Sequence, residues 1–365
     1  MKKESFEFLL SLLNTPSPSS LETLGQKVWI DYVKNYAHRV EVDAYGNAVA
    51  TLNLEGKPKI LVNGHIDEIA FQVQYVDDNG FIYFSPVGGP DPKLSRGRKV
   101  NIFHEGKVVP GVIGTLAIHM QEKEGQEKTP KWNELFIDIG ASSRDEALEH
   151  VQVGDLVLYD SEAFCLLNDI WISRGCDDKV GAFVAAEVLR ICSEEKISAP
   201  CIVAASTIQE ENGLYGASMI GYSIHPDIAI VVDVGHATDI PIADKKKFGD
   251  IRLGKGPILS HGSVNHPGIV DYLNKLAHKL SLSHQHGIDP RRSGTDADAL
   301  FIQRGGIPSC SIGIPNRYMH SPVEAFHLKD LETAATWIAA FCKEIKSREE
   351  ILPSIEKEPF LEKRF

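Results

Sequence analysis

The sequence predicts a mixed α/β fold that carries a β-rich insertion, and three observations lead to that expectation. Apolar strands alternate with helical patterns near both ends of the 365-residue chain. The middle instead contains short alternating strands separated by glycine-containing turns. Insertions into surface loops are well tolerated, because chain entry and exit can lie close together. We therefore expect one α/β domain built from residues 1–70 and 168–365, with residues 71–167 inserted as a second domain.

The N-terminal segment predicts two helices, a hairpin and an apolar strand. The stretch "MKKESFEFLLSLLN" is an amphipathic helix by its spacing. The pair Ser19 and Glu22 fits a capping box, which predicts a second helix that continues to Tyr36. Residues 45–47 form a turn between two alternating runs, which is a hairpin signature. The apolar strand "PKILVNGHIDEIA" follows and carries His65 near its end.

The middle of the chain has the texture of a small all-β module. The stretches "FQVQYVDDNGFIYFSPVGG", "RKVNIFHEGKVVPGVIG" and "VQVGDLVLYD" are short runs bounded by Gly and Asn-Gly turns. The polar segment 121–134 within this module is predicted to be a loop.

The α/β alternation returns after this module. Helical spacing and apolar runs predict helices over 177–193, 268–280 and 328–345, and strands over 201–208, 227–233 and 308–314. No internal repeat interrupts this order.

Composition excludes several classes of protein. A net charge of −12 and a pI near 5.6 argue against a protein that binds nucleic-acid backbones. No apolar run approaches the roughly 18 residues of a membrane span. Glu4 and Glu7 interrupt the only stretch that resembles a signal peptide, and the six cysteines are scattered without a C-x-x-C pair. We expect a cytoplasmic protein that binds neither nucleic acid nor membranes.

Imidazole and carboxylate side chains recur where predicted strands end or a helix begins. These residues are His65, Asp67, Asp177, Asp178, Glu210, Glu211, Asp233 and His320. In open α/β sheets, sites form outside the carboxyl ends of the strands, so these segments are expected to converge. Two histidines with several carboxylates suit a metal such as zinc or cobalt.

Each residue alone has an ordinary interpretation. His65 could be a core histidine, Asp177 a helix N-cap, and the pair Glu210 and Glu211 the start of a solvated loop. Their joint occurrence favours a site instead. Two divalent ions about 3.5–4 Å apart need a bridging carboxylate and terminal ligands on each side, and Asp177 is the natural bridge. Asp67 lies on the same face of an extended strand as His65 and could orient its ring.

Six stretches resemble, in order and over nearly the whole chain, the successive motifs of the tetrahedral (TET-type) metallo-aminopeptidases, a family that includes glutamyl and deblocking aminopeptidases. They are "NGHIDEIA", "SRGCDDKVG", "TIQEENGLYGA", "IVVDVGHATDIP", "SGTDADALFIQRGGIPS" and "NRYMHSPVEAFHLKDL". The resemblance implies a mixed-sheet zinc-peptidase catalytic domain with α/β/α layers. It also implies a PDZ-like inserted domain that mediates assembly, commonly into hollow dodecamers built from dimers.

The resemblance also implies a role for each candidate residue. His65 and Asp233 would be terminal ligands of one divalent ion, Glu211 and His320 those of a second, and Asp177 would bridge them. Glu210 would be the general base and Asp67 the partner that supports His65. The implied activity is a two-metal aminopeptidase that removes N-terminal residues from short peptides, with zinc or cobalt as the metal.

Other functions stay open at this point. The main alternative is a metal-dependent amidase or deacylase that acts on N-acyl amino acids. A glycosidase with Glu210 and Glu211 as paired carboxylates is a weaker alternative. Retaining enzymes need carboxyl groups about 5–5.5 Å apart that flank one bond and usually come from different segments, and neighbouring residues are poorly disposed for that. A non-catalytic shell protein is the third. The preferred N-terminal residue is not predicted, and His119, His236, His261 and His266 receive no role.

Overall fold

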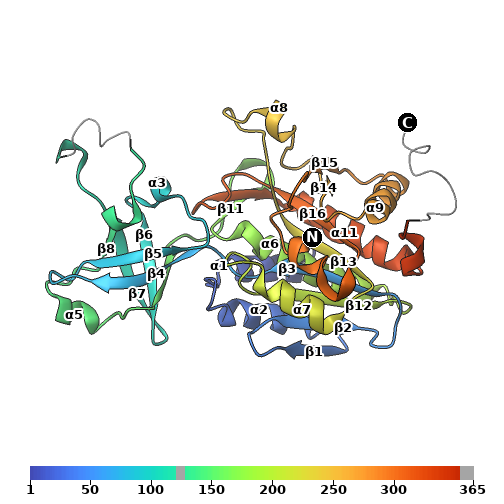
Figure 1. Ribbon diagram of the computed structural model, residues 1–365, viewed down its shortest axis with the longest axis horizontal. Coiled ribbons are helices and arrows are strands. Elements are labelled where there is room, and N and C mark those ends of the chain that lie inside the picture. Colours follow the sequence, from blue (N-terminus) through green and yellow to red (C-terminus); the bar gives the residue numbers. More distant parts are fainter. Residues whose placement is uncertain (121–127, 354–365) are drawn as a thin grey trace.

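A mixed eight-stranded sheet with helices on both faces forms the body of the protein, and a small barrel lies to one side of it (Figure 1). The computed structural model describes residues 1–120 and 128–353. Within these ranges, no helix is long and apolar enough to cross a membrane.

The central sheet has the order β1-β2-β12-β3-β13-β16-β14-β15. Its strands are β1 (Arg39–Val42), β2 (Ala48–Leu52), β3 (Lys59–His65), β12 (Cys201–Thr207), β13 (Ile228–His236), β14 (Ile258–His261), β15 (Gln285–Ile288) and β16 (Ser309–Asn316). The four middle strands, β12, β3, β13 and β16, are parallel neighbours. Strands buried on both faces favour long apolar runs, and these middle strands are almost fully buried.

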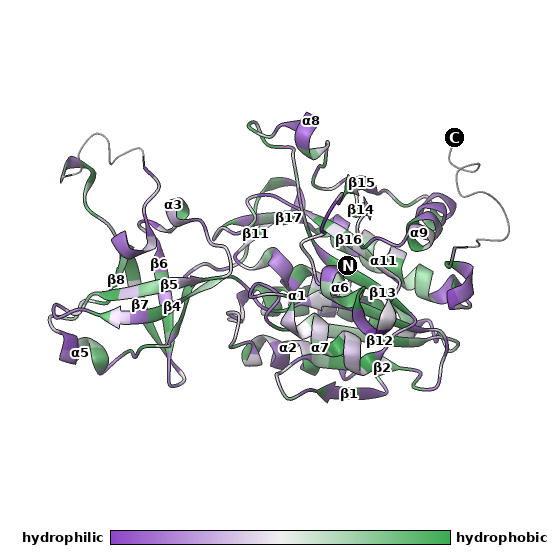
Figure 2. Ribbon diagram, viewed as in Figure 1, coloured by the Kyte–Doolittle hydropathy of each residue, from purple (hydrophilic) through white to green (hydrophobic). Residues whose placement is uncertain are grey.

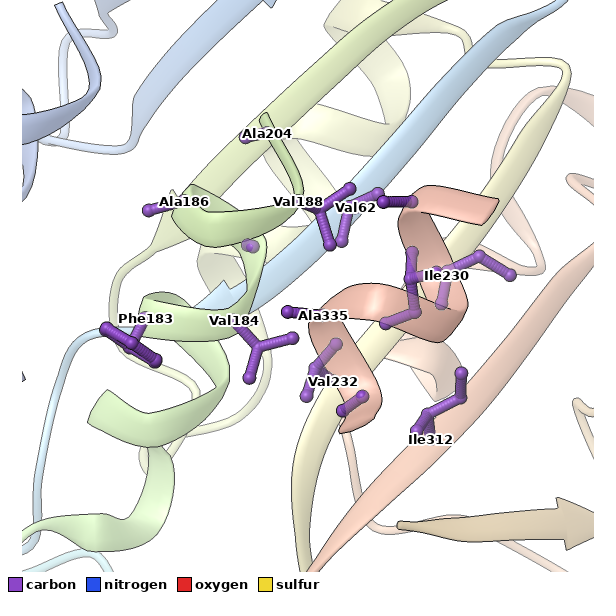
Figure 3. Close-up of a cluster of buried hydrophobic side chains, with 14 of the residues drawn as sticks. Val62, Phe183, Val184, Ala186, Val188, Ala204, Ile230, Val232, Ile312 and Ala335 are labelled. Atoms are coloured by element: carbon purple, nitrogen blue, oxygen red, sulfur yellow. The ribbon is translucent and has the colours of Figure 1, made fainter. Parts of the chain in front are cut away.

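Two helical layers cover the sheet, so the predicted α/β/α arrangement is confirmed. One face packs against α1 (Lys3–Asn14), α2 (Thr23–Val33), α6 (Cys176–Glu194), α9 (Pro267–Leu280) and α11 (Leu328–Glu344), and the other packs against α7 (Tyr215–Ile224) and α10 (Ala297–Leu300). Alternate strand residues point to opposite faces. Val62 and Ile230 therefore meet Val184 of α6 and Ala335 of α11 in one core (Figure 3), whereas Leu61 and Val231 belong to the other.

The β-rich insertion is a closed barrel of six strands in the order β4-β5-β8-β7-β6-β9. They are β4 (Ala70–Val76), β5 (Ile82–Val87), β6 (Lys99–His104), β7 (Lys107–Gly114), β8 (Phe136–Asp138) and β9 (Leu156–Tyr159). Its interior is a separate apolar cluster in which Phe71 packs edge-on against Tyr159, with ring centroids 5.2 Å apart. Figure 2 shows hydrophobic segments both in the strands of the barrel and in those of the central sheet. The domain limits 71 and 167 stay a prediction.

Several shorter elements complete the two parts. The helices α3 (Pro92–Ser95) and α5 (Arg144–Leu148) belong to the insertion, and α8 (Lys245–Phe248) projects from the body. The strands β10 (Phe164–Cys165), β11 (Ile170–Ser173) and β17 (Glu324–His327) form a three-stranded sheet. Residues 121–127 of the predicted polar loop lie outside the described ranges, and Trp132–Glu134 is a short 3-10 helix.

The predicted capping box at the second helix is wrong. α2 begins at Thr23, and no side chain caps it. The Glu22 carboxylate instead accepts hydrogen bonds from the backbone N–H groups of Ser20 (2.7 Å) and Gln209 (3.2 Å). Burial, together with the nearby Asp67 charge, raises the pKa of Glu22 to about 7. Tertiary contact with the turn after β12 has therefore replaced the local cap.

Two glycines allow β3 and α6 to pack backbone against backbone. A Cβ atom on Gly64 would lie 2.3 Å from the carbonyl carbon of Gly181 and 2.4 Å from the nitrogen of Ala182. Real Cβ atoms do not approach backbone so closely, so any larger residue must displace the helix. This close contact sets the distance between the strand that ends in His65 and the helix that begins beside Asp177.

We predict that Gly64→Ala lowers the free energy of unfolding by about 1–3 kcal/mol or more, because the new methyl group overpacks this contact. Chemical denaturation measures the change. Ser206→Ala is the matched control, because Ser206 is the strand partner of Gly64 and its buried hydroxyl has no hydrogen-bond partner in the described chain. Equal stability of the two variants would contradict the proposed steric role of Gly64.

Candidate metal centre

All of the predicted site residues converge at the carboxyl ends of the parallel strands. His65 ends β3 and Asp233 lies in β13, while Asp177 lies in the first turn of α6. Glu210 and Glu211 follow β12, and His320 follows β16. Their ligand atoms form two groups, each with atoms within 4.8 Å of one another: His65, Glu210 and Asp233, and Asp177, Glu211 and His320.

Asp177 connects the two groups. Its Oδ1 lies 3.2 Å from Nε2 of His65, and its Oδ2 lies 3.3 Å from Nε2 of His320. Each carboxylate oxygen therefore faces one imidazole. A carboxylate shared between two ions would need this arrangement.

The remaining carboxylates surround the two imidazoles. Nε2 of His65 lies 3.8 Å from Glu210 Oε2 and 4.0 Å from Asp233 Oδ1. Nε2 of His320 lies 3.5 Å from Glu211 Oε1. Asp67 contacts the opposite edge of His65, with its carbonyl oxygen 3.1 Å and its Oδ1 3.4 Å from Nδ1. The predicted proximity of Asp67 to His65 is thus present.

A turn after β12 lets two adjacent glutamates reach one site. Regular strand geometry would send neighbouring side chains to opposite faces. The chain instead leaves the strand at Gln209, where φ is +51°, and Asp67 accepts hydrogen bonds from the N–H groups of Glu210 (3.0 Å) and Glu211 (3.2 Å). The N–H of Gly213 bonds back to the Glu210 carbonyl at 2.9 Å. Asp67 therefore fixes the backbone of both glutamates as well as the His65 ring.

Glu324 is a buried part of the site that the sequence interpretation missed. Its Oε2 accepts a hydrogen bond from the N–H of Asp177 (2.9 Å), and its Oε1 accepts one from the N–H of His320 (2.8 Å). It therefore holds two candidate ligands from separate segments. The available signal was a single carboxylate inside the apolar stretch "SPVEAFHL".

Buried charges behind the ligands were also missed. Glu68 bonds to Lys179 (2.6 Å) and to Arg174 (2.6 Å), whose positions flank Asp177 in the sequence. Burial lowers the pKa of Lys179 to about 8, although Glu68 opposes this change.

Two further buried aspartates support the end of β3. Asp296 accepts hydrogen bonds from Asn63 (2.7 Å) and Thr207 (2.6 Å). Asp178, predicted with the set, accepts the N–H of His65 at 3.2 Å and does not belong to either ligand group.

Burial of so many carboxylates changes their acidity. Burial, with the neighbouring Asp233 and Asp296 charges, raises the pKa of Glu210 to about 10, although His65 opposes the change. Burial also raises the pKa of Asp233. The hydrogen bond to Asp177 raises the pKa of His320 to about 9. In the described part of the chain, only histidines form ion pairs with the carboxylates of Asp177, Glu210, Glu211 and Asp233. This excess of negative charge favours a bound cation.

The donor set fits divalent metal ions. Nε2 of His65 and Oε1 of Glu211 are buried without a hydrogen-bond partner in the described chain. Two ligand atoms that each lie about 2 Å from a tetrahedral ion are about 3.3 Å apart, close to the Asp177–imidazole distances of 3.2 and 3.3 Å. Imidazole and carboxylate donors suit zinc and cobalt, so these residues could hold both expected ions.

The site opens into a cavity of about 770 Å³. Its walls include Asp177, Glu211, Asp233 and His320, together with residues 245–249, 286–289 and 293–295. The cavity is large enough for a short peptide.

The four histidines without a predicted role lie in different places. His236 lines the cavity. Nε2 of His261 lies 2.9 Å from Nδ1 of His286. His266 caps α9 by accepting a hydrogen bond from the N–H of Gly268, and His119 is exposed in a short 3-10 helix.

Comparison with known proteins identifies the relatives of this chain. The family model for M42 glutamyl aminopeptidases matches residues 46–336. A putative aminopeptidase of Acetivibrio thermocellus is 34% identical over 336 residues, which cover 91% of this chain and 97% of the relative.

Solved structures agree with that match. A TET aminopeptidase from the marine sediment archaeon Thaumarchaeota archaeon SCGC AB-539-E09 has a TM-score of 0.90 and 29% identity, covering 95% of this chain and 98% of the other. The Pyrococcus horikoshii TET1 peptidase, which can assemble into a tetrahedron or a large octahedral shell, has a TM-score of 0.83 and 29% identity, covering 93% and 100%.

We predict that Asp177→Asn weakens the binding of both ions by at least about 100-fold, because Asp177 lies between the two groups, with one oxygen 3.2 Å from Nε2 of His65 and the other 3.3 Å from Nε2 of His320. His320→Ala removes a ligand from a single group and leaves one ion bound. Metal content after dialysis, measured by mass spectrometry, distinguishes the two variants. Asp271→Asn on the exposed side of α9 is the control and retains both ions. An Asp177→Asn protein that keeps two tightly bound ions would contradict the bridging geometry.

Proposed function

The chain belongs to the M42 glutamyl aminopeptidase family, and on this basis we propose that it is a dinuclear metal-dependent aminopeptidase that releases N-terminal amino acids from short peptides. The observation that carries the two-metal proposal is the position of Asp177, whose two oxygens lie 3.2 and 3.3 Å from Nε2 of His65 and of His320. Aminopeptidase chemistry follows from the family, and the two ligand groups around Asp177 support the metal dependence.

The proposed ligands divide between two ions. His65 and Asp233 would hold one, Glu211 and His320 would hold the other, and Asp177 would be shared. Zinc or cobalt held there would supply Lewis-acid chemistry, activating water and polarising the scissile carbonyl. The two ligand groups found around Asp177 support this division, except that Glu210 also lies within reach of the first group.

Glu210 is the proposed general base. It lines the cavity, and its Oε2 lies 3.8 Å from Nε2 of His65, so it is positioned beside the ligands. The carboxylate accepts a proton from the attacking water and returns it to the leaving amine. Asp67 acts through others: it orients His65 and fixes the backbone of Glu210.

Assembly is part of the proposal. Residues 71–167 are proposed to mediate self-association into a dodecamer built from dimers. The shells formed by the Pyrococcus horikoshii relative support assembly, and exposed apolar residues on the barrel, such as Val108, Val112 and Val153, support its participation. The acidic net charge and the scattered, unpaired cysteines support a cytoplasmic location.

We predict that Glu210→Gln retains both metal ions and lowers kcat by about 100- to 10,000-fold, because it removes the proton carrier but no ligand. Steady-state kinetics and metal content on the same sample measure both effects. Glu149→Gln, on the exposed end of the barrel helix α5, is the charge-matched control and keeps wild-type activity. A metal-loaded Glu210→Gln protein with near-normal kcat would eliminate Glu210 as the base.

Substrate class is tested separately. We expect hydrolysis of aminoacyl anilides and short peptides with a free α-amine, and at least about tenfold lower kcat/KM on N-acetylated amino acids. Activity on peptides should disappear on chelation and return with zinc or cobalt. Preference for the N-acyl substrates would favour the amidase alternative, and glycoside hydrolysis that survives chelation would favour the paired-carboxylate alternative.

A further inference from the structure

The first hairpin of the inserted barrel returns the chain to the metal centre. β4 begins at Ala70, five residues after His65, and β5 ends at Val87, which pairs with Ala70 in the antiparallel register. Gly88 and Gly89 follow directly. The two strands lie side by side in the barrel (Figure 1). The entry to the insertion and the Gly88–Gly89 segment therefore lie together beside the ligands.

Both glycines contact ligands of the same proposed ion. The carbonyl oxygen of Gly89 lies 3.0 Å from Nδ1 of His320. Gly88 lies against Glu211, because a Cβ atom there would be 2.9 Å from Oε2 of Glu211. A Cβ atom on Gly89 would be 2.9 Å from Nδ1 of His320. Neither position can carry a larger side chain without moving a ligand.

The Gly89 contact fixes the state of the His320 ring. A carbonyl oxygen only accepts hydrogen bonds, so Nδ1 of His320 must carry the proton. In the neutral ring that ligates a metal, the lone pair then lies on Nε2, which faces Asp177 at 3.3 Å and Glu211 at 3.5 Å. Carbonyl partners of this kind select the ligating tautomer and ring orientation of a metal-binding histidine.

The two proposed ion sites differ in which part of the fold supplies the hydrogen-bond partner of the histidine Nδ1 atom. The Nδ1 partner of His65 is the carbonyl of Asp67, two residues away on the same segment. The Nδ1 partner of His320 comes from the barrel, 231 residues away in sequence. The α/β body therefore builds the His65 group by itself, whereas the His320 group needs a backbone group from the insertion.

We infer that Gly89 is a positioning residue for His320, so that the inserted barrel completes one of the two metal sites in addition to its proposed role in assembly. Gly88 supports the same site by leaving room for Glu211. The inference rests on the proposed two-metal site. An ordinary alternative is that both glycines only shape the end of β5, and the two interpretations predict different metal binding.

The test compares metal binding in full-length variants. Gly89→Ala should bind one ion about 10- to 100-fold more weakly and keep the other unchanged, measured by titration against a chromophoric chelator and by metal content. Gly88→Ala should give the same selective loss. Gly97→Ala is its matched control, because φ is +70° at Gly97 and +71° at Gly88, but no atom of the described residues lies within 4 Å of a Cβ placed on Gly97. Circular dichroism and native mass verify folding and assembly.

A double-mutant cycle separates positioning from general damage. In a His320→Ala background, Gly89→Ala should not change the affinity for the remaining ion, because its partner is already absent. The inference is overturned if Gly89→Ala binds two ions with wild-type affinity, or if it weakens both ions equally. Wild-type protein that binds no pair of ions would instead refute the two-metal site itself.

Discussion

Repulsion among buried carboxylates is the constraint on which the site depends. Asp177, Glu211 and Asp233 lie close together at one end of the sheet. In the described chain, the side chains that form ion pairs with them are the imidazoles of His65 and His320. Isolated buried charges are costly, so such a cluster is stable only with compensating positive charge or bound protons. The raised pKa values of Glu211 and Asp233 express that cost. Divalent ions would remove it, which links the stability of the centre to its proposed chemistry.

The fold meets this constraint by bringing rigid segments together from distant parts of the sequence. Parallel strands end at the same edge of the sheet, and the close Gly64–Gly181 contact sets the spacing of β3 and α6. Backbone N–H groups are then held by further carboxylates: Asp67 binds the turn after β12, and Glu324 binds the N–H groups of Asp177 and His320. Supporting groups that lock ligand geometry are typical of metal sites.

The sequence predicted the elements with long apolar patterns, because apolar spacing and strand ends are local features. It predicted α6, α9 and α11 closely, and it placed His65, Asp177 and His320 in one site. The prediction failed where tertiary contacts override local preference. Glu22 does not cap α2, because its carboxylate instead accepts a hydrogen bond from the N–H of Gln209 in the turn after β12. Glu324 was missed because a buried carboxylate that accepts only backbone hydrogen bonds has no spacing signature. Closure of the barrel depends on long-range pairing of β4 with β9, which no local pattern encodes.

The most direct test is a crystal structure of the zinc-loaded protein with anomalous data collected on both sides of the zinc edge. Two anomalous peaks about 3.5–4 Å apart are expected, one on each side of the Asp177 carboxylate, with His65 bound to one and His320 to the other. A single peak, or two peaks that do not share Asp177, in crystals grown from catalytically active protein would contradict the two-metal centre.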